Sequence, residues 1–286
     1  MPLERKLANP GFGMALVLCL MVVGIQTWMS VPLAVVDEVL EKGFQLPRAG
    51  LAQSPLIVAF INLLALGAPI ALGLFLNRLQ FREAFPLARV TLAQASAMAL
   101  TILGADLLLS EADNLFRSVF PAPQFLIEAY RQVFTSQGKL VERIFLLVIV
   151  APVTEELLFR GIILRGLLYR YGPVTAVGLS ALLFALVHLN PWQFISVFWL
   201  GIAFGWFFLR TGSINICILA HAVSNGLFVL FTSIGTDIPG LTSEPDPKHV
   251  LFQPWWLDTA GVLMLLGGIG CFSLATRPSP PASHEP

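Results

Sequence analysis

The residues with chemical potential are ionisable side chains that lie inside otherwise apolar stretches. Glu155, Glu156 and Arg160 stand close together in the middle of one hydrophobic run. Glu156 and Arg160 are four residues apart, so on a helix they share a face and can form an ion pair. Glu155 lies about 100° away around the helix, which leaves its carboxylate without that partner. Because an ionised group is costly inside a membrane, Glu155 needs another partner or a water-filled cavity.

Two histidines and an asparagine lie in later apolar runs. His188 follows Phe184 by four residues, and Asn225 follows His221 by the same interval. Residues four apart lie on one face of a helix, so His221 and Asn225 point in a common direction. A single histidine in an apolar helix is usually a hydrogen-bonding residue, so its meaning depends on what it can reach.

Helix geometry brings Glu155 and His188 to the same depth. Glu155 lies about 17 residues before the turn signal at 171–173, and His188 lies about 16 residues after it. Each is therefore about 25 Å from that turn. By the same arithmetic, His221 and Asn225 lie about 14 and 20 Å from the turn that precedes them. This leaves the second pair shallower than Glu155 by about 5 to 10 Å, and tilt or an enclosed cavity has to close the gap.

Together these side chains are typical of hydrolysis by an activated water molecule. Glu155 would act as the general base, and His188 would help to hold and polarise the water. His221 and Asn225 would donate hydrogen bonds to the developing oxyanion, and one such donor is typically worth about 3 to 4 kcal/mol of barrier. The Glu156 ion pair would orient the helix that carries Glu155.

A metal site is an alternative use of the same residue types. Glu155, Glu156, His188 and His221 are all side chains that zinc accepts as ligands. Membrane metalloproteases usually carry an HExxH motif, however, and this sequence has none. A GxSxG nucleophile motif is also absent. We therefore expect no cofactor and keep zinc as a minor alternative.

One more acid lies inside an apolar window. Asp106 is near the end of the stretch 91–109. An acid at such a position is a functional hypothesis by default. The sequence leaves open whether Asp106 faces the membrane interface or the cavity.

The elements that must position these residues are membrane helices. Of 286 residues, 56% are hydrophobic and 12% are charged, and the mean hydropathy is +0.79. This charge fraction is about half that of a typical soluble domain. Lysine plus arginine and aspartate plus glutamate each number 17, so no basic excess favours a nucleic-acid partner. The lipid bilayer is the expected surrounding of most of the chain.

Several windows are long enough to span a bilayer, which needs about 20 apolar residues of helix. They lie at 11–36, 55–76, 91–109, 143–168, 174–188, 192–209, 214–234 and 255–275. The sequence therefore predicts an all-α fold, a polytopic integral membrane bundle of about eight transmembrane helices. We expect N-terminal transmembrane helices in 1–139 and a surface loop at 110–142, which is either one or two helices lying on the membrane surface or a plain extramembrane loop. A catalytic core is expected at 140–235, a loop and the last helix at 236–277, and a disordered tail at 278–286.

The charges in the loops predict an orientation. Basic residues are more numerous on the side that carries the N-terminus, and the positive-inside rule places that side in the cytoplasm. Both termini are then cytoplasmic. We expect a multi-pass protein of the plasma (inner) membrane of a bacterium.

Three motifs in a fixed order resemble the CPBP family. They are Glu-Glu-xxx-Arg at 155–160, Phe-xxx-His at 184–188 and His-xxx-Asn at 221–225. This family includes the type II CAAX prenyl endopeptidases and bacteriocin-processing or immunity proteins, also called the ABI family. The resemblance covers residues 140–231 and implies an intramembrane glutamic endopeptidase. It implies that water is activated by Glu155 and His188, that the oxyanion is bound by His221 and Asn225, and that Glu156 and Arg160 have supporting roles.

The resemblance also implies a partner and leaves alternatives open. The substrate would be a protein or peptide at the bilayer, in some members lipidated at its C-terminus. Other members serve as immunity factors or scaffolds, so a non-enzymatic membrane role is an alternative. A transporter is a further alternative, because intramembrane glutamate and histidine also serve transport. The sequence shows no repeated pair of broken helices that would support it.

Overall fold

The computed structural model describes residues 11–45, 50–128, 140–233, 237–242 and 250–276. Within these ranges the regular structure is helical, with no strand, which confirms the predicted all-α class. The tail at 278–286, which we predicted to be disordered, lies outside the described residues.

The described part of the chain is built from helical segments. In chain order they are α2 (Phe12–Glu38), η1 (Val39–Gly43), η2 (Leu51–Gln53), α3 (Pro55–Asn77), α4 (Phe81–Ala84), α5 (Leu92–Val119), α7 (Leu140–Ile144), η3 (Phe145–Val150), α8 (Ala151–Glu156), η4 (Leu157–Leu164), α9 (Arg165–Leu168), α10 (Pro173–Leu186), α11 (Pro191–Thr211), α12 (Ile214–Ser233) and α13 (Trp255–Ala275). The segments α7 to α9 form one continuous helical run in which α-helix alternates with the π-helical segments η3 and η4.

Local sequence explains where the main helices begin and end. Helix α5 begins with a capping box in which Thr91 and Gln94 each bond the other's backbone N–H. Proline occupies the first turn of α10 and of α11, where its missing N–H costs nothing. Helix α11 ends at Gly212, whose φ of 65° is left-handed and therefore suits glycine.

Each predicted membrane window coincides with a helical segment. Among the described residues, six helices are long and apolar enough to cross a membrane: Phe12–Gly43, Pro55–Asn77, Leu92–Val119, Pro191–Thr211, Ile214–Ser233 and Trp255–Ala275. The window 143–168 corresponds to the run α7 to α9, and the window 174–188 corresponds to α10, which has only 14 residues. The helical membrane bundle is confirmed, with six of the eight predicted spans meeting this length criterion.

One predicted boundary differs from the structure. We expected a surface loop from residue 110 onward, but α5 continues without a break to Val119. Residues 124–128 are helical as well. The charged residues after Ser110 misled the prediction, because they lie on an α5 that extends beyond its most apolar part.

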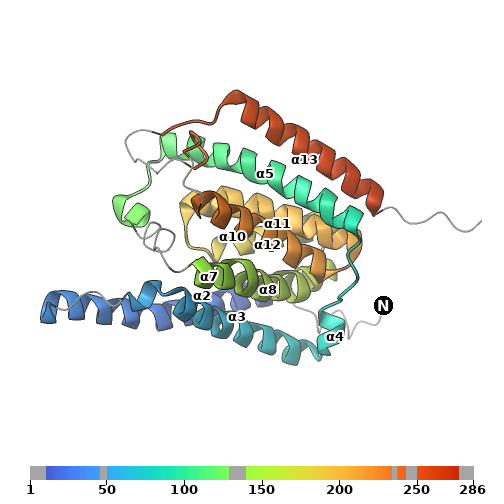
Figure 1. Cartoon of the computed structure of the whole chain (residues 1–286). Coiled ribbons are helices and arrows are strands. Elements are labelled where there is room, and N and C mark those ends of the chain that lie inside the picture. Colours follow the sequence, from blue (N-terminus) through green and yellow to red (C-terminus); the bar gives the residue numbers. More distant parts are fainter. Residues whose placement is uncertain (1–10, 46–49, 129–139, 234–236, 243–249, 277–286) are drawn as a thin grey trace, which may run out of the picture.

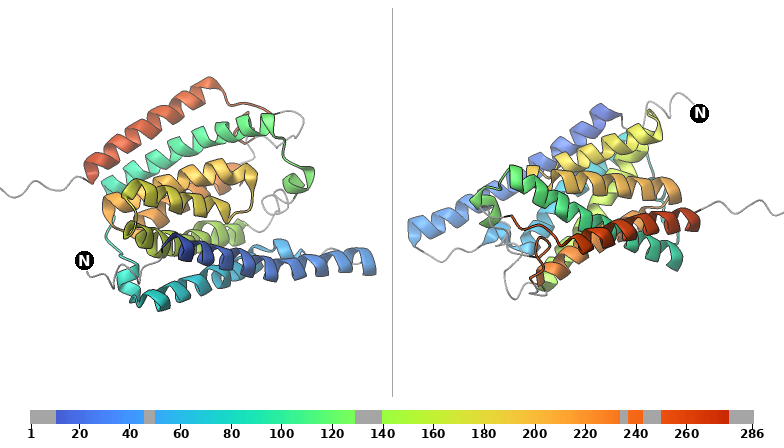
Figure 2. Two further views of the ribbon diagram at one scale, coloured as in Figure 1. Left: turned by 180° about the vertical axis from the view of Figure 1, so that it is seen from behind. Right: turned by 90° about the horizontal axis from the view of Figure 1, so that it is seen from above.

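The helices are arranged in layers. Figure 1 shows α5 and α13 side by side along one edge of the bundle and α2 and α3 along the opposite edge, with α10, α11, α12 and the α7–α9 run between them. The two further views in Figure 2 show the same grouping. The main buried cluster is shared by residues of the run and of α2, α3, α5 and α10 to α13. The central layer is thus covered by one pair of helices along each of two opposite edges.

Glycines let the outer pair of helices pack closely. A Cβ atom added to Gly104 of α5 would lie 2.4 Å from the backbone nitrogen of Leu265 in α13. A Cβ atom added to Gly268 of α13 would lie 2.5 Å from the backbone nitrogen of Thr101 in α5. Such approaches leave no room for a side chain, so α5 and α13 are held in one relative position.

Candidate active site

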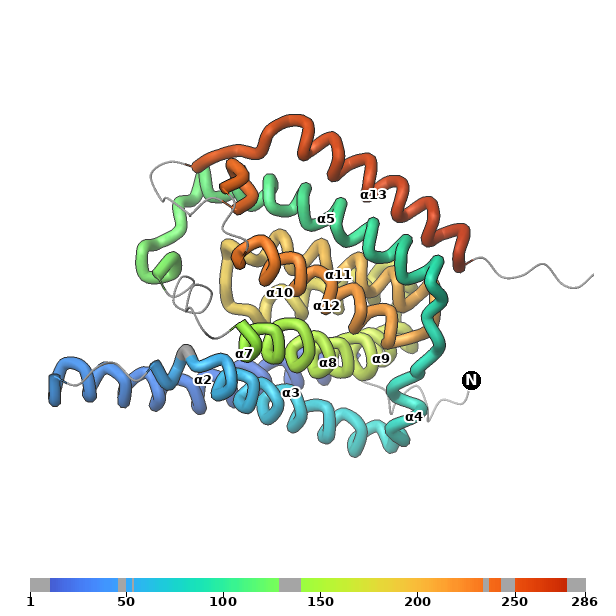
Figure 3. Tube along the Cα trace, in the orientation of Figure 1, coloured from blue at the N-terminus to red at the C-terminus, as the bar shows by residue number. Residues whose placement is uncertain are grey.

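The two glutamates lie on the short helix α8, which π-helical segments flank on both sides. Figure 3 shows this part of the chain as one continuous coil through α7, α8 and α9. Pro152 explains why the regular pattern fails before the acids, because proline has no N–H to donate and its ring opposes an undistorted α-helix. π-helical turns inside α-helices are frequent at functional sites.

Glu156 and Arg160 form the ion pair that their spacing predicts. Arg160 Nη1 donates to Glu156 Oε1 at 2.8 Å, and both side chains are 0% exposed. Arg160 Nη2 also donates to the carbonyl oxygen of Gly201 on α11, at 3.1 Å. The guanidinium lies over the rings of Phe184 and Phe204, 4.8 and 5.2 Å from their centroids. Arg160 therefore ties the run to α10 and α11 by charge, hydrogen bonding and cation–π contact.

His221 of α12 lies between the two glutamates. Its Nδ1 is 2.9 Å from Glu156 Oε1, and its Nε2 is 3.9 Å from Glu155 Oε2. A carboxylate only accepts hydrogen bonds, so Nδ1 carries a proton that it donates to Glu156, and Nε2 faces Glu155. The Phe204 ring stacks on the imidazole at 5.2 Å. Glu156 thus fixes the position of His221 and keeps a proton on its Nδ1.

The predicted gap in depth between Glu155 and His221 is closed in the structure. The arithmetic assumed an α-helical rise throughout, but residues 157–164 are π-helical. A π-helix places more residues in each turn, so the distance from Glu155 to the turn at 172–173 is shorter than an α-helix would make it. The shorter rise closes part of the gap, and the 3.9 Å between His221 Nε2 and Glu155 Oε2 places the two side chains at one level.

Glu155 has a different environment from Glu156. Its side chain is 15% exposed, and its buried oxygen Oε2 has no hydrogen-bond partner among the described residues. Arg160 pairs with Glu156 and not with Glu155, as the helical spacing predicts. A partly accessible carboxylate with an unsatisfied buried oxygen is suited to hold and deprotonate a small polar molecule such as water.

His188 is placed near this group without touching Glu155 among the described contacts. Its Nδ1 lies 2.8 Å from the carbonyl oxygen of Phe184, so Nδ1 donates and Nε2 is left free. The Phe184 ring meets the rings of His188 and His221 edge-on, at 5.1 and 5.8 Å between centroids. Phe184 therefore sets the spacing of the two imidazoles and of Arg160.

Asn225 is held by the irregular helix opposite. Its Nδ2 donates to the carbonyl oxygen of Leu147 in η3 at 2.8 Å. In this π-helical segment a carbonyl oxygen accepts from the N–H group five residues later, as Leu146 accepts from Ala151. The carbonyl of Leu147 would therefore accept from residue 152, but Pro152 has no N–H. Proline thus leaves a carbonyl that orients Asn225, and the second N–H of that amide stays available.

Asp106 is the residue whose place the sequence left open. It lies on α5 and accepts a hydrogen bond at 2.9 Å from the Ser224 hydroxyl of α12, within the turn that carries His221 and Asn225. The signal that pointed to it was its position inside an apolar window. No sequence pattern pointed to Ser224, since a serine is unremarkable in a membrane helix.

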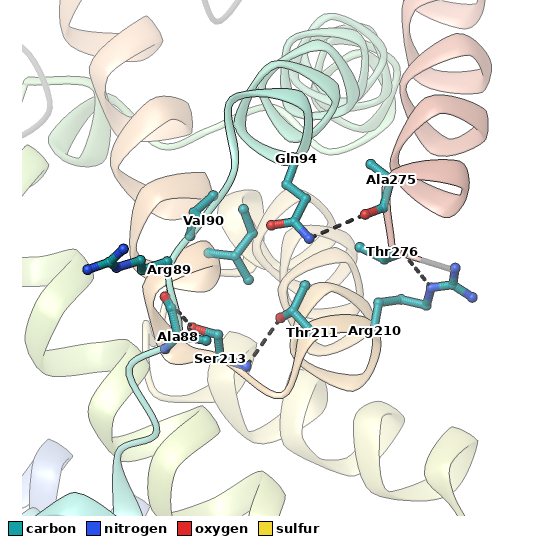
Figure 4. Close-up of a pocket in the computed structure, with 10 residues that line it drawn as sticks. Ala88, Arg89, Val90, Gln94, Arg210, Thr211, Ser213, Ala275 and Thr276 are labelled. Atoms are coloured by element: carbon teal, nitrogen blue, oxygen red, sulfur yellow. Dashed lines mark hydrogen bonds between the residues drawn. The ribbon is translucent and has the colours of Figure 1, made fainter. Parts of the chain in front are cut away.

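Two cavities in the described part of the chain lie away from this group. One, of about 270 Å³, is at the far ends of α11 and α13 and is lined by residues such as Arg89, Gln94 and Arg210 (Figure 4). The other, of about 430 Å³, is apolar and lies between α2 and α3. Neither is lined by a predicted site residue. Within the described part of the chain, no three His, Cys, Asp or Glu side chains are grouped so that they could hold a metal ion.

Comparison with known proteins identifies the class. Residues 137–227 match a protein-family model described as Type II CAAX prenyl endopeptidase Rce1-like. The matched segment contains the predicted residues on α8, η4 and α12 and also His188, which follows the end of α10, and it supports the family resemblance of their motifs. No curated protein and no solved structure matches the chain. Residues 137–227 are therefore similar to the type II CAAX prenyl endopeptidases, and they lie within a multi-pass helical membrane protein.

Proposed function

We propose that the protein is an intramembrane glutamic endopeptidase that hydrolyses a peptide bond with an activated water molecule. The observation that carries this proposal is the contrast between the two neighbouring acids. Glu156 is fully buried and paired with Arg160 and His221, whereas Glu155 keeps an unsatisfied oxygen 3.9 Å from His221 Nε2. A structural ion pair needs only the first arrangement, so the second supports a chemical role for Glu155.

In the proposed reaction Glu155 takes a proton from water while the water oxygen attacks the carbonyl carbon of the substrate. The Nε2 atom of His188 helps to hold this water, which is the role that its motif implies. The negative charge moves to the carbonyl oxygen, where His221 and Asn225 are proposed to donate hydrogen bonds. The C–N bond then breaks, and the proton on Glu155 passes to the leaving amine. The products are a carboxylate and a new amino terminus.

The proposed substrate is a protein or peptide cleaved close to the membrane, with a lipidated C-terminus as the CAAX-like case. This assignment rests on the family match and on the position of the site among membrane helices. A lipid anchor would bring a polypeptide to a site that apolar helices surround, since each buried CH₂ contributes about 0.8 kcal/mol to membrane binding.

Cleavage of peptides by the purified full chain in detergent tests the proposal. Because a general base typically contributes about 10²- to 10⁴-fold, Glu155→Ala should reduce cleavage by at least that lower factor. Glu83→Gln, which changes an exposed acid on α4, is the matched control and should cleave like the unaltered chain. Equal cleavage by Glu155→Ala and the unaltered chain would overturn the proposal.

A chelator experiment separates this mechanism from the zinc alternative. The proposed chemistry uses a carboxylate and imidazoles to activate water, so cleavage should persist after treatment with a strong chelator. Loss of cleavage that added Zn²⁺ restores would move the assignment to a metalloprotease.

A cellular experiment separates the enzyme from a non-enzymatic immunity or scaffold protein. Glu155→Gln keeps the size and most of the packing of the side chain but removes the base. A cellular role that depends on proteolysis should be lost in this variant, and a role that survives would show that binding alone is the function.

A further inference from the structure

Asp106 is a buried acid that the proposed reaction does not use. It lies on α5, outside the segment that matches the endopeptidase family. Its Oδ1 accepts the hydrogen bond from Ser224, while its Oδ2 is buried and has no hydrogen-bond partner among the described residues. An acid in this position is costly, so its presence in the bundle calls for a specific role.

Ser224 is well placed to transmit the effect of Asp106 to the site. It follows His221 by three residues and directly precedes Asn225, so the three side chains belong to one turn of α12. The side chain of Ser224 is buried against α5. A hydrogen bond from this turn to a separate helix restricts rotation of α12 about its own axis.

The orientation of that turn matters because both site residues depend on fixed contacts. His221 reaches Glu156 and Glu155 from its two ring nitrogens, at 2.9 and 3.9 Å, and Asn225 reaches Leu147 at 2.8 Å. A misplacement of about 1 Å in a catalytic arrangement can reduce the rate about 10²-fold. Asp106 also interacts electrostatically with His221, which adds a second connection to the same ring.

We propose that Asp106 is a positioning residue of the active site, which acts through Ser224 to hold the turn of α12 that carries His221 and Asn225. The inference rests on the proposed function for its effect on catalysis, but not for its effect on the placement of His221. It extends the site onto α5, beyond the segment in which the family motifs lie.

Nuclear magnetic resonance tests the placement without any substrate. The chain has four histidines, so selective histidine labelling of the full chain in detergent gives few ring signals, and a His221 variant assigns the relevant one. Asp106→Ala and Ser224→Ala should each shift the His221 ring signals, whereas Asp106→Asn and Ser224→Thr, which keep an acceptor and a hydroxyl, should largely restore them. Unshifted His221 signals in both alanine variants would overturn the proposal, whatever the protein catalyses.

Kinetics test the consequence for the reaction. Each alanine variant should lower kcat about 10-fold or more with little change in KM, because the turn and not the substrate contact is altered. The double variant should be no worse than either single variant, because both remove one interaction. Thr101→Val, which removes another buried hydroxyl from α5, is the matched control.

The outcomes distinguish the two proposals. The double variant could lower kcat by the product of the two single-variant factors, or the variants could lower the melting temperature and leave kcat unchanged. Either result would show that Asp106 and Ser224 only stabilise the bundle. Full cleavage by Glu155→Ala would overturn the proposed function, while the histidine spectra would still decide the role of Asp106.

Discussion

Two adjacent glutamates of the same helix have different surroundings, and this difference organises the site. Glu156 lies among a guanidinium, an imidazole and two phenyl rings, with no exposed surface. Glu155 has a partly accessible side chain and a buried oxygen that no neighbour satisfies. One residue is suited to hold the helices together, and the other is suited to react.

This contrast predicts opposite phenotypes for two matched substitutions. Glu156→Gln leaves the buried Arg160 without its counter-ion, so the free energy of unfolding should fall by about 3 to 5 kcal/mol. Glu155→Gln should leave stability nearly unchanged and abolish cleavage. Thermal unfolding of both variants in one detergent measures the difference. If both variants had the same melting temperature, the proposed division of roles between the two acids would be wrong.

Much of the residue-level arrangement could be predicted from spacing alone. The Glu156–Arg160 pair and the separation of Glu155 from it follow from helical geometry, and the structure confirms both. The contact between His221 and Glu156 could not be predicted, because it depends on how α12 packs against α8. Asp106 was visible as an intramembrane acid, but its partner Ser224 comes from a helix more than a hundred residues away.

At the scale of elements, close packing of α5 against α13 fixes the helix that carries Asp106. Gly267 and Gly268 of α13 are neighbours in the sequence but face different surroundings. A Cβ atom on Gly268 would meet the backbone of Thr101, whereas a Cβ atom on Gly267 would meet nothing within 4 Å. The α5–α13 contact therefore depends on one of these two glycines.

Alanine at each of these positions tests the packing. Gly268→Ala forces α13 away from α5 and should lower the free energy of unfolding by about 1 to 3 kcal/mol. Gly267→Ala should be neutral or stabilising, because alanine favours helix over glycine by up to about 1 kcal/mol. Thermal unfolding in detergent compares the two variants. A larger loss of unfolding free energy for Gly267→Ala than for Gly268→Ala would contradict this packing of α13 against α5.

The helices themselves were more predictable than their irregularities. Apolar windows located each of the main helices, since length and hydropathy depend on sequence alone. The π-helical segments η3 and η4 were missed, and with them the shorter distance from Glu155 to the next turn. Pro152 was the available signal, but proline by itself does not say which distortion a helix will adopt.

At the scale of the whole molecule, charge is divided between the two ends of the bundle. One end carries Arg78, Arg82, Arg89, Arg165, Arg170 and Arg210, with Glu83 as the acid among its described residues. The other end carries the acids of 37–41, 111–113, 128, 142, 237 and 258, with Lys42, Arg117 and Arg143. Both ends of the described chain lie at the arginine-rich end, where Gly11 meets Arg170 and Thr276 bonds Arg210 (Figure 1).

This division predicts the orientation of the protein in the membrane. By the positive-inside rule, we expect the arginine-rich end, and with it both termini, to be cytoplasmic. With Cys271→Ser as background, a cysteine at Gln124 should react with an impermeant maleimide in intact cells. A cysteine at Glu83 should react only after permeabilisation. The reverse pattern would invert the predicted topology.

The shortness of α10 has a consequence for how water arrives. Its 14 residues extend about 21 Å, whereas the hydrocarbon core of a bilayer is about 30 Å thick. A helix this much shorter than its surroundings thins the membrane beside it or draws polar groups inward. His188 follows the end of α10, so this hydrophobic mismatch would create a local hydrated depression through which a hydrolytic reaction inside the membrane can be supplied.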